Sequence, residues 1–209
     1  MAKHLHPPIQ LVLITDSKRF ADQQAMLACI EQAIQGGVDT VVLREKHLDS
    51  AKLLSLASKL RILTRNQHAR LIIHSHADIA KAVEADGVHV DAQSIQEIMQ
   101  IKQWLDGDYL VSASCHNEAE LKHAEKQGAD FCFLSPVFPT RSHPGAPCLG
   151  ATQFLKLASC VKIPVIALGG IEPDVFEQLQ GHGVATMGGI LNAPQPKQAA
   201  QALQYKHDA

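Results

Sequence analysis

The stretch Val165-Ile166-Ala167-Leu168-Gly169-Gly170-Ile171 is followed, about twenty residues later, by Val184-Ala185-Thr186-Met187-Gly188-Gly189-Ile190. Each is an apolar run typical of a buried strand, and each ends in a glycine pair. Glycine pairs let backbone N–H groups approach an anion, and the loops after strands 7 and 8 of a (β/α)8 barrel form its usual phosphate site. We therefore expect a phosphate at Gly169, Gly170, Gly188 and Gly189; the alternative is two tight turns without a ligand.

Eight short apolar runs alternate with helix-period segments along the whole chain. The expected strands are Leu11–Thr15, Thr40–Leu43, Leu71–His74, Gly87–Val90, Leu110–Ser114, Phe131–Leu134, Val165–Leu168 and Val184–Met187. The expected helices lie near Asp22–Gln35, Ser50–Gln67, Asp78–Ala85, Ser94–Leu105, Glu118–Lys126, Thr152–Ala158, Pro173–Gln180 and Pro196–Tyr205. Continuous apolar strands are typical of a parallel sheet buried on both faces. The pattern predicts an α/β protein, a single (β/α)8 TIM barrel domain over residues 1–209.

The main alternative to the barrel is an open, doubly wound sheet. Such a sheet places its glycine-rich phosphate loop after the first strand. Here the first strand ends Ile14-Thr15-Asp16-Ser17, without a glycine. This favours the barrel.

Composition argues against several classes of function. The 209 residues are 46% hydrophobic, with a formal net charge of −2 and a pI near 6.6, so we expect neither a nucleic-acid nor a membrane partner. No apolar run approaches membrane-spanning length. The five cysteines show no zinc-binding spacing. We expect a cytoplasmic protein with reduced thiols.

Two cations follow the second expected strand. Arg44 and Lys46 should point the same way, together with Val42, because side chains alternate along a strand. Two cations on one face suit a phosphate or diphosphate, which arginine can bind bidentately. The alternative is a pair of solvated charges with Glu45 between them.

Histidines stand at the ends of the third, fourth and fifth expected strands. His74 and His76 could chelate a metal, but the sequence shows no obvious third ligand. His89 could equally be a buried, hydrogen-bonded histidine. Cys115 and His116 are neighbours on a strand and should point apart, which argues against a catalytic dyad.

One long, proline-rich connection, residues 135–150, follows the sixth expected strand and is a candidate lid. It carries Thr140, Arg141, Ser142 and His143, which offer hydroxyls and a cation to a second anion. We expect His143 to close over the ligand as an acid, a base or a phosphate contact, with His116 as its rival. The alternative is a loop histidine held in water.

These residues, in this order, resemble the thiamin phosphate synthase family and its sister branch, the TenI-like thiazole tautomerases, over nearly the whole chain. The matching stretches are residues 43–46, 85–89, 114–116, 128–130, 136–140, 166–171 and 183–190. The resemblance implies a (β/α)8 barrel of thiamin biosynthesis. Synthases join hydroxymethylpyrimidine pyrophosphate to hydroxyethylthiazole phosphate and release pyrophosphate with the assistance of Mg2+.

The resemblance also implies roles for individual residues. Those implied to hold phosphate groups are Arg44 and Lys46 for the pyrophosphate, Thr140 and Ser142 for phosphate oxygens, and Gly170, Met187 and Gly188 for the thiazole phosphate. Ser114 would approach the pyrimidine or its leaving group. We expect His74, His89 and His116 to complete the pocket.

The sequence departs from the synthase pattern where the metal is bound. Ser75 and Ser94 occupy the positions of the two aspartates that serve Mg2+, Val42 that of a glutamine, and His143 that of a lysine. Magnesium prefers hard oxygen ligands, and serine is a poor substitute for a carboxylate. We therefore expect weak or no Mg2+ binding and a synthase activity that is slow or lost.

Two alternatives to the synthase remain: a tautomerase-like proton-transfer enzyme and a non-catalytic, regulatory binder of phosphorylated thiamin precursors. Pro136 stands where the tautomerase branch has its catalytic histidine. Residues 112–116 and 135–150 are most similar to the synthase-like domain fused behind a Nudix pyrophosphohydrolase in some bacteria, which indicates a functional link to such a hydrolase. Here we expect no Nudix segment before the barrel, whose first strand is expected at Leu11–Thr15. The sequence does not decide between a monomer and a homo-oligomer.

Overall fold

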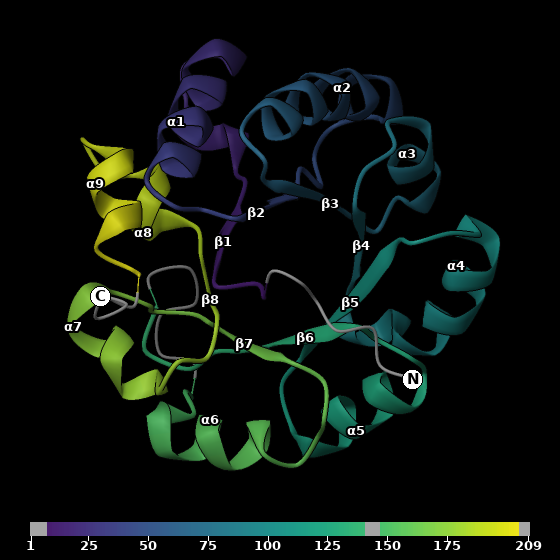
Figure 1. The fold of residues 1–209 in the computed structure, drawn as a ribbon, viewed down its shortest axis with the longest axis vertical. Helices are drawn as coiled ribbons and strands as arrows, with labels where there is room; N and C mark the ends of the chain where they lie inside the picture. The colour runs from purple at the N-terminus through teal and green to yellow at the C-terminus, as the bar shows by residue number, and fades with distance from the viewer. Residues whose placement is uncertain (1–7, 141–146, 205–209) are drawn as a thin grey trace.

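The computed structural model describes residues 8–140 and 147–204, and its eight strands form one closed parallel barrel in chain order (Figure 1). The strands are β1 (Leu11–Ile14), β2 (Thr40–Leu43), β3 (Arg70–His74), β4 (Gly87–Val90), β5 (Leu110–Cys115), β6 (Phe131–Leu134), β7 (Val165–Leu168) and β8 (Val184–Thr186). Leu11 pairs with Val184, which joins the last strand to the first. The predicted (β/α)8 barrel is confirmed.

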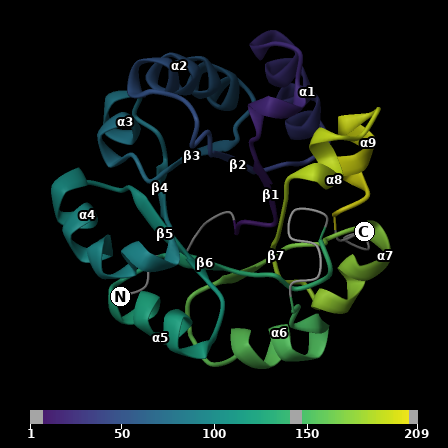
Figure 2. The ribbon, with the colours of Figure 1, turned by 180° about the vertical axis from the view of Figure 1, so that it is seen from behind.

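Helices surround the barrel on all sides (Figures 1 and 2). They are α1 (Gln23–Gln35), α2 (Ser50–Asn66), α3 (Ala77–Ala82), α4 (Ile98–Leu105), α5 (Glu118–Lys126), α6 (Gly150–Ala158), α7 (Pro173–Phe176), α8 (Gly188–Leu191) and α9 (Pro196–Gln201). Short 3-10 helices accompany them: η1 (Ser17–Arg19), η2 (Ala92–Glu97) and η3 (Glu177–Leu179). Helix α9 packs on α1, so that the last helix meets the first.

The expected helices differ from the observed ones at particular places. The helix expected over residues 94–105 is η2 followed by α4, and that expected over 173–180 is α7 followed by η3. Neither η1 nor α8 was expected, because both are too short to show a helical period. Asp22, Asp49 and Asn117 cap α1, α2 and α5 with side-chain hydrogen bonds to backbone N–H groups, which explains why these helices start as predicted.

Three aspartates fasten neighbouring strands together at the amino end of the barrel. Asp39, Asp86 and Asp130 each precede a strand, and their carboxylates accept backbone N–H bonds of 2.7–2.9 Å from the strand before it. Arg61 and Lys102 add ion pairs of 2.6 and 2.8 Å to Asp86 and Asp130. These three aspartates therefore have a structural role remote from the carboxyl ends of the strands.

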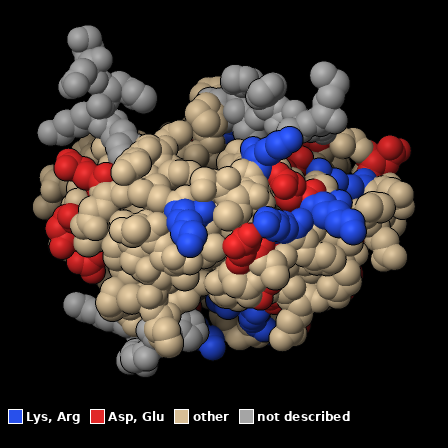
Figure 3. All heavy atoms as spheres, turned by 90° about the horizontal axis from the view of Figure 1, so that it is seen from below, with Lys and Arg blue, Asp and Glu red and all other residues tan. Residues whose placement is uncertain are grey.

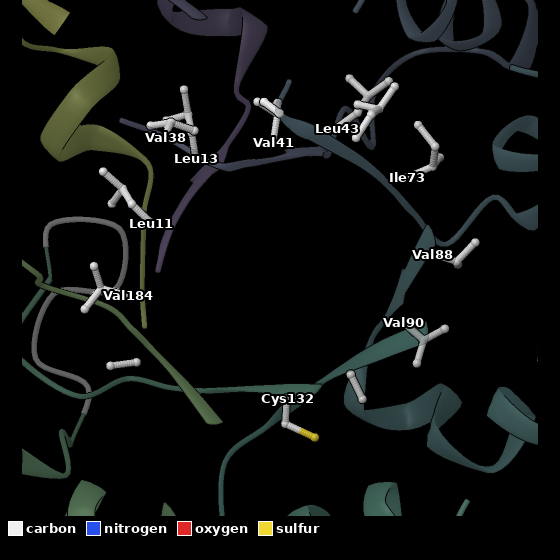
Figure 4. Close-up of a cluster of buried hydrophobic side chains, with 14 of the residues drawn as sticks. Leu11, Leu13, Val38, Val41, Leu43, Ile73, Val88, Val90, Cys132 and Val184 are labelled. Carbon is white, nitrogen blue, oxygen red and sulfur yellow. The ribbon is translucent and has the colours of Figure 1, made fainter. Parts of the chain in front are cut away.

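Side chains of the strands alternate between the helices and the barrel interior. Figure 4 shows ten labelled residues, which pack outward against the helices: Leu11, Leu13, Val38, Val41, Leu43, Ile73, Val88, Val90, Cys132 and Val184. The interior is filled by a second buried cluster: Ile9, Val12, Ile14, Val42, Ile72, Leu110, Phe131, Phe133, Ile166 and Ala185. Two residues beyond Ile72 and Leu110, the interior positions become His74 and Ser112. The barrel interior is thus apolar toward the amino ends of the strands and polar toward their carboxyl ends.

On the face shown in Figure 3, Lys and Arg side chains lie beside Asp and Glu side chains. Acidic and basic groups therefore offset one another locally on that face. None of the helices in the described ranges combines the length and the apolar character needed to cross a membrane.

Candidate active site

A pocket of about 1580 Å³ opens at the carboxyl ends of the strands. Every predicted site residue that the structure describes lines it: Arg44, Lys46, His74, His89, Ser114, His116, Thr140, Gly169, Gly170, Met187, Gly188 and Gly189. Ser142 and His143 lie outside the described residues, so their roles stay predictions. A pocket for one small ligand occupies about 300–1,000 Å³, so this pocket has room for two.

Arg44 and Lys46, which we call the basic pair, follow β2 and face the pocket, as strand alternation predicts. Lys46 Nζ lies 3.0 Å from Asp91 Oδ2, which follows β4. Burial acts to raise the pKa of Asp91, but the hydrogen bond from Lys46 and the contact with His74 outweigh it and lower that pKa. Within the described ranges no carboxylate pairs with the Arg44 guanidinium, which leaves its N–H groups for a ligand.

His74 lies in the barrel interior between a carboxylate and a hydroxyl. Its Nε2 is 3.2 Å from Asp91 Oδ1, and its Nδ1 is 2.9 Å from Ser75 Oγ. Burial, opposed by Asp91 but aided by the basic pair, lowers the pKa of His74 to about 4. The ring is therefore neutral at pH 7, and its contact with Asp91 is a hydrogen bond from Nε2–H rather than an ion pair.

His89 is held by one hydroxyl on each ring nitrogen. Ser112 Oγ lies 2.9 Å from Nδ1 and Ser114 Oγ 2.8 Å from Nε2. Burial, together with the nearby His74, lowers the pKa of His89 to about 3, so the neutral ring has a single N–H. Ser112 is fully buried, and a buried hydroxyl that only accepted would leave its hydrogen unpaired. We therefore assign Ser112 as donor to Nδ1 and Ser114 as acceptor from Nε2–H, which leaves the Ser114 hydroxyl free to donate to a ligand.

These two histidines predict that the fold weakens in acid. Both titrate near pH 6.5 in the unfolded chain, whereas the folded pKa values are about 4 for His74 and about 3 for His89. Below pH 6.5 the unfolded chain then binds more protons than the folded chain, so the free energy of unfolding falls as the pH falls toward 4. The slope is about 1.4 kcal/mol per pH unit for each histidine.

Urea unfolding at pH 7 and pH 4.5 measures this effect, with a His89→Gln variant as the comparison. The wild type is expected to lose about 2 kcal/mol more than the variant over this interval. Carboxylates that titrate in the same range are common to both proteins and cancel in the difference. Equal losses would show that His89 is not a neutral, buried ring.

The first glycine pair is required by the loop that packs against it. Gly169 and Gly170 have φ values of 99° and 65°. A Cβ on Gly169 would lie 3.1 Å from Pro136 Cα, and one on Gly170 would lie 2.4 Å from Pro139 O. Close packing is therefore sufficient to explain both glycines, which agrees with the alternative interpretation of tight turns without a ligand. The pair also lines the pocket, so phosphate binding there stays a prediction.

The second glycine pair, Gly188 and Gly189, begins α8 at the edge of the pocket. Their backbone N–H groups have no acceptor within the helix that they begin. A Cβ on Gly188 would lie 3.0 Å from Asn192 Nδ2 and 3.8 Å from Arg19 Nη1. Gly188 therefore lies beside a guanidinium that no sequence pattern had singled out.

Glu45 has a structural role that the sequence did not reveal. It is 4% exposed, so it is not a solvated charge between the two cations. Its carboxylate accepts hydrogen bonds from Ser17 N at 3.0 Å and from Ser17 Oγ at 2.7 Å. These bonds fix η1, which ends at Arg19 in the pocket lining. The two partners are 28 residues apart in the chain, so no local pattern could have paired them.

His116 and Cys115 point to opposite sides of β5, as alternation predicts. His116 lines the pocket, and its Nδ1–H donates to the carbonyl oxygen of Ser135 at 2.8 Å. Cys115 is buried among the helices, and its hydrogen bond with Cys132, followed by burial, raises the pKa of its thiol. The two side chains form no catalytic dyad.

The described residues do not fit a two-carboxylate magnesium site. Neither Ser75 nor Ser94 lines the pocket, and Ser94 Oγ donates to a neighbouring glutamate at 3.2 Å. Asp91 does place a carboxylate beside the basic pair, but it is already bonded to Lys46 and His74. In residues 8–140 and 147–204, no three His, Cys, Asp or Glu side chains are grouped to hold a metal. Magnesium needs several hard oxygen ligands, so its site here is incomplete.

The fold and the pocket define a (β/α)8 protein with cations and glycine loops at its carboxyl-terminal face, which is where enzymes of this class bind phosphorylated ligands. Residues 11–191 match the model of one family, described as thiamine monophosphate synthase. The chain belongs to this family.

Relatives resemble the chain over nearly its whole length. A thiamine-phosphate synthase of Methanobrevibacter smithii is 31% identical over 198 residues, which cover 93% of both chains. A protein of Geobacter sulfurreducens, named as a candidate thiamine-phosphate synthase, is 40% identical over 198 residues, or 92% of both chains. The solved structure of a thiamine phosphate pyrophosphorylase from Pyrococcus furiosus superposes with a TM-score of 0.82 at 28% identity, covering 93% of both chains.

Proposed function

We propose that this protein is a thiamin-phosphate synthase, a transferase that joins hydroxymethylpyrimidine pyrophosphate to hydroxyethylthiazole phosphate and releases pyrophosphate. The observation that carries the proposal is that one pocket contains two separate groups suited to anions. The basic pair follows β2, and the glycine pairs follow β7 and β8. Two phosphorylated substrates need two such groups, one for the diphosphate and one for the phosphate monoester.

The arrangement supports departure of the diphosphate. When the bond between the pyrimidine methylene carbon and the diphosphate oxygen breaks, the diphosphate keeps the electron pair, and negative charge grows on its oxygens. Arg44 and Lys46 are placed to stabilise that charge in a partly enclosed pocket. The Ser114 hydroxyl, oriented by His89, donates to the pyrimidine or to the leaving oxygen. Phosphate binding near Gly188 positions the thiazole so that its ring nitrogen can form the new bond to the pyrimidine methylene carbon as the diphosphate leaves.

The incomplete metal site predicts a slow reaction that depends little on Mg2+. Wild-type turnover is expected to change less than about twofold on adding chelator, because Ser75 and Ser94 supply no carboxylate. A Ser75→Asp, Ser94→Asp double variant should gain a Mg2+-dependent rate, about tenfold above wild type. Ser75 has a φ of 63°, a conformation that aspartate tolerates better than most residues do.

Chromatography of thiamin phosphate, with and without chelator, makes this measurement. Ser75→Asn with Ser94→Asn is the matched control, because it adds similar bulk without charge. A wild-type enzyme that is as fast as ordinary synthases and is inactivated by chelator would mean that other residues bind the metal.

A second function, ligand binding without turnover, is favoured by one observation, the serines at both metal positions. The same assay separates the two functions. Binding of both precursors by calorimetry, with no product after long incubation, would support a regulatory binder and overturn the synthase.

We also propose that residues 1–209 act as one domain on phosphorylated thiamin precursors in the cytoplasm. All five cysteines are free thiols, which supports a reducing compartment. A functional link to a Nudix hydrolase is supported by residues 112–116 and 135–150, of which 141–146 lie outside the described residues. A change in turnover on adding such a hydrolase would test the link, and light scattering would test for a homo-oligomer.

A further inference from the structure

We propose that Arg19 is a phosphate-binding residue of this pocket and that it selects a phosphate monoester dianion over the corresponding alcohol. The proposal rests on the proposed function, because it adds a side-chain cation to the subsite that the glycine pairs line. Arg19 ends η1, just after β1, and reaches the subsite from a loop far away in the sequence.

The Arg19 guanidinium spans from the β1 loop to the β8 loop. Nη1 donates to Asn192 Oδ1 at 3.0 Å, and Nη2 lies 3.7 Å from Met187 Sδ. Nη1 would also lie 3.8 Å from a Cβ placed on Gly188. The cation therefore lies beside Gly188, which lines the pocket. A phosphate oxygen accepting the backbone N–H of Gly188 would come within reach of the guanidinium.

Other residues hold this side chain in place before a ligand arrives. Nε donates to Asp16 Oδ2 at 2.8 Å, and Glu45 fixes Ser17 two residues earlier. The Arg19 side chain is 29% exposed, so a ligand in the pocket can still reach it. An arginine that is already ordered loses little rotamer entropy when it binds an anion.

The Arg19 guanidinium has further N–H groups with which it can bind a ligand. Three of its five N–H groups point at Asp16, Asn192 and Met187, and the thioether is a weak acceptor. Asp16 occupies the Nε edge, while the Nη edge faces Gly188. Arginine and backbone N–H groups together suit a phosphate, whose oxygens accept several charge-assisted hydrogen bonds. An uncharged alcohol would gain much less from the same groups.

A purely structural role is the competing explanation, since the same contacts join the β1 loop to α8. The two roles differ in what they do to an uncharged ligand. A structural clamp would affect the ester and the alcohol alike, because its loss deforms the whole subsite. A phosphate-binding arginine affects the ester alone.

The experiment is calorimetry on full-length Arg19→Gln with three probes: hydroxyethylthiazole phosphate, hydroxyethylthiazole and inorganic phosphate. The expected result is at least tenfold weaker binding of the ester and of phosphate, with the affinity for the alcohol unchanged within twofold. Arg19→Lys keeps the charge but not the fork, and should recover part of the loss. Arg65→Gln, which removes an exposed arginine of α2 paired with Glu84, is the matched control and should change nothing.

Equal weakening of ester and alcohol, or unchanged affinity for the ester, would overturn the assignment of Arg19. Failure of the proposed function would look different, because the wild type itself would not bind the ester. Urea unfolding checks that Arg19→Gln folds. If it does not, Arg19→Lys carries the test, and an ester-to-alcohol preference equal to that of the wild type would contradict selection by the arginine fork.

Discussion

Replacing Gly188 with aspartate is expected to weaken binding of hydroxyethylthiazole phosphate by about 100-fold or more while the barrel stays folded. A Cβ at this position would lie 3.0 Å from Asn192 Nδ2, the end of a side chain that can move. The new carboxylate would point toward Arg19, take the place of the phosphate and repel it. Like charges placed side by side in a binding site cost several kcal/mol, and about 3 kcal/mol corresponds to the expected loss.

Calorimetry with the ester measures this loss, and Gly188→Ala is the matched control because it adds the Cβ without the charge. Gly170 offers no such test. Its φ is 65°, and a Cβ there would lie 2.4 Å from Pro139 O, so any substitution disturbs the fold as well. If Gly188→Asp bound the ester as tightly as the wild type does, the glycine pair after β8 would not be part of the phosphate-binding site.

Replacing Arg44 with alanine is expected to lower kcat/KM for the pyrimidine diphosphate by about 100-fold or more. In the described ranges its guanidinium has no carboxylate partner, so its charge is available to the diphosphate both on binding and as the bond breaks. Lys46→Ala should lower kcat/KM by a smaller factor, because Lys46 already forms an ion pair with Asp91 at 3.0 Å.

Steady-state kinetics on both variants, with calorimetry of inorganic pyrophosphate, checks this order. Arg65→Ala on α2 controls for loss of one positive charge. If Arg44→Ala kept its affinity for pyrophosphate while Lys46→Ala lost it, the lysine would be the principal anion contact and the arginine a surface charge.

The fold was largely predictable from the sequence because the barrel strands are buried on both faces. All four residues of Thr40–Leu43 are buried, so the strand is a continuous buried run in the sequence, and the observed β2 has the predicted bounds. The observed β6 and β7 also have the predicted bounds, Phe131–Leu134 and Val165–Leu168. Helix α8 was missed because its four residues begin with two glycines, which disfavour helix and fit a loop equally well.

The site was predictable only where a residue stands directly at a strand end. Arg44, His74 and Ser114 were found in this way, because strand position alone fixes their direction. Arg19 and Glu45 act through partners 173 and 28 residues away, and such pairings depend on closure of the whole barrel. Asp91 reaches Lys46 from the loop after β4, and the two partners are 45 residues apart, so no local pattern could have paired them.

The central claim is that one pocket binds both precursors and joins them. Its most direct test is to incubate the protein with hydroxymethylpyrimidine pyrophosphate and hydroxyethylthiazole phosphate, and to follow thiamin phosphate and pyrophosphate by chromatography, with Gly188→Asp as the blank. The account predicts that both products appear slowly, in equal amounts, and only with the wild type. Equal product in the blank, or no product from the wild type, would contradict it.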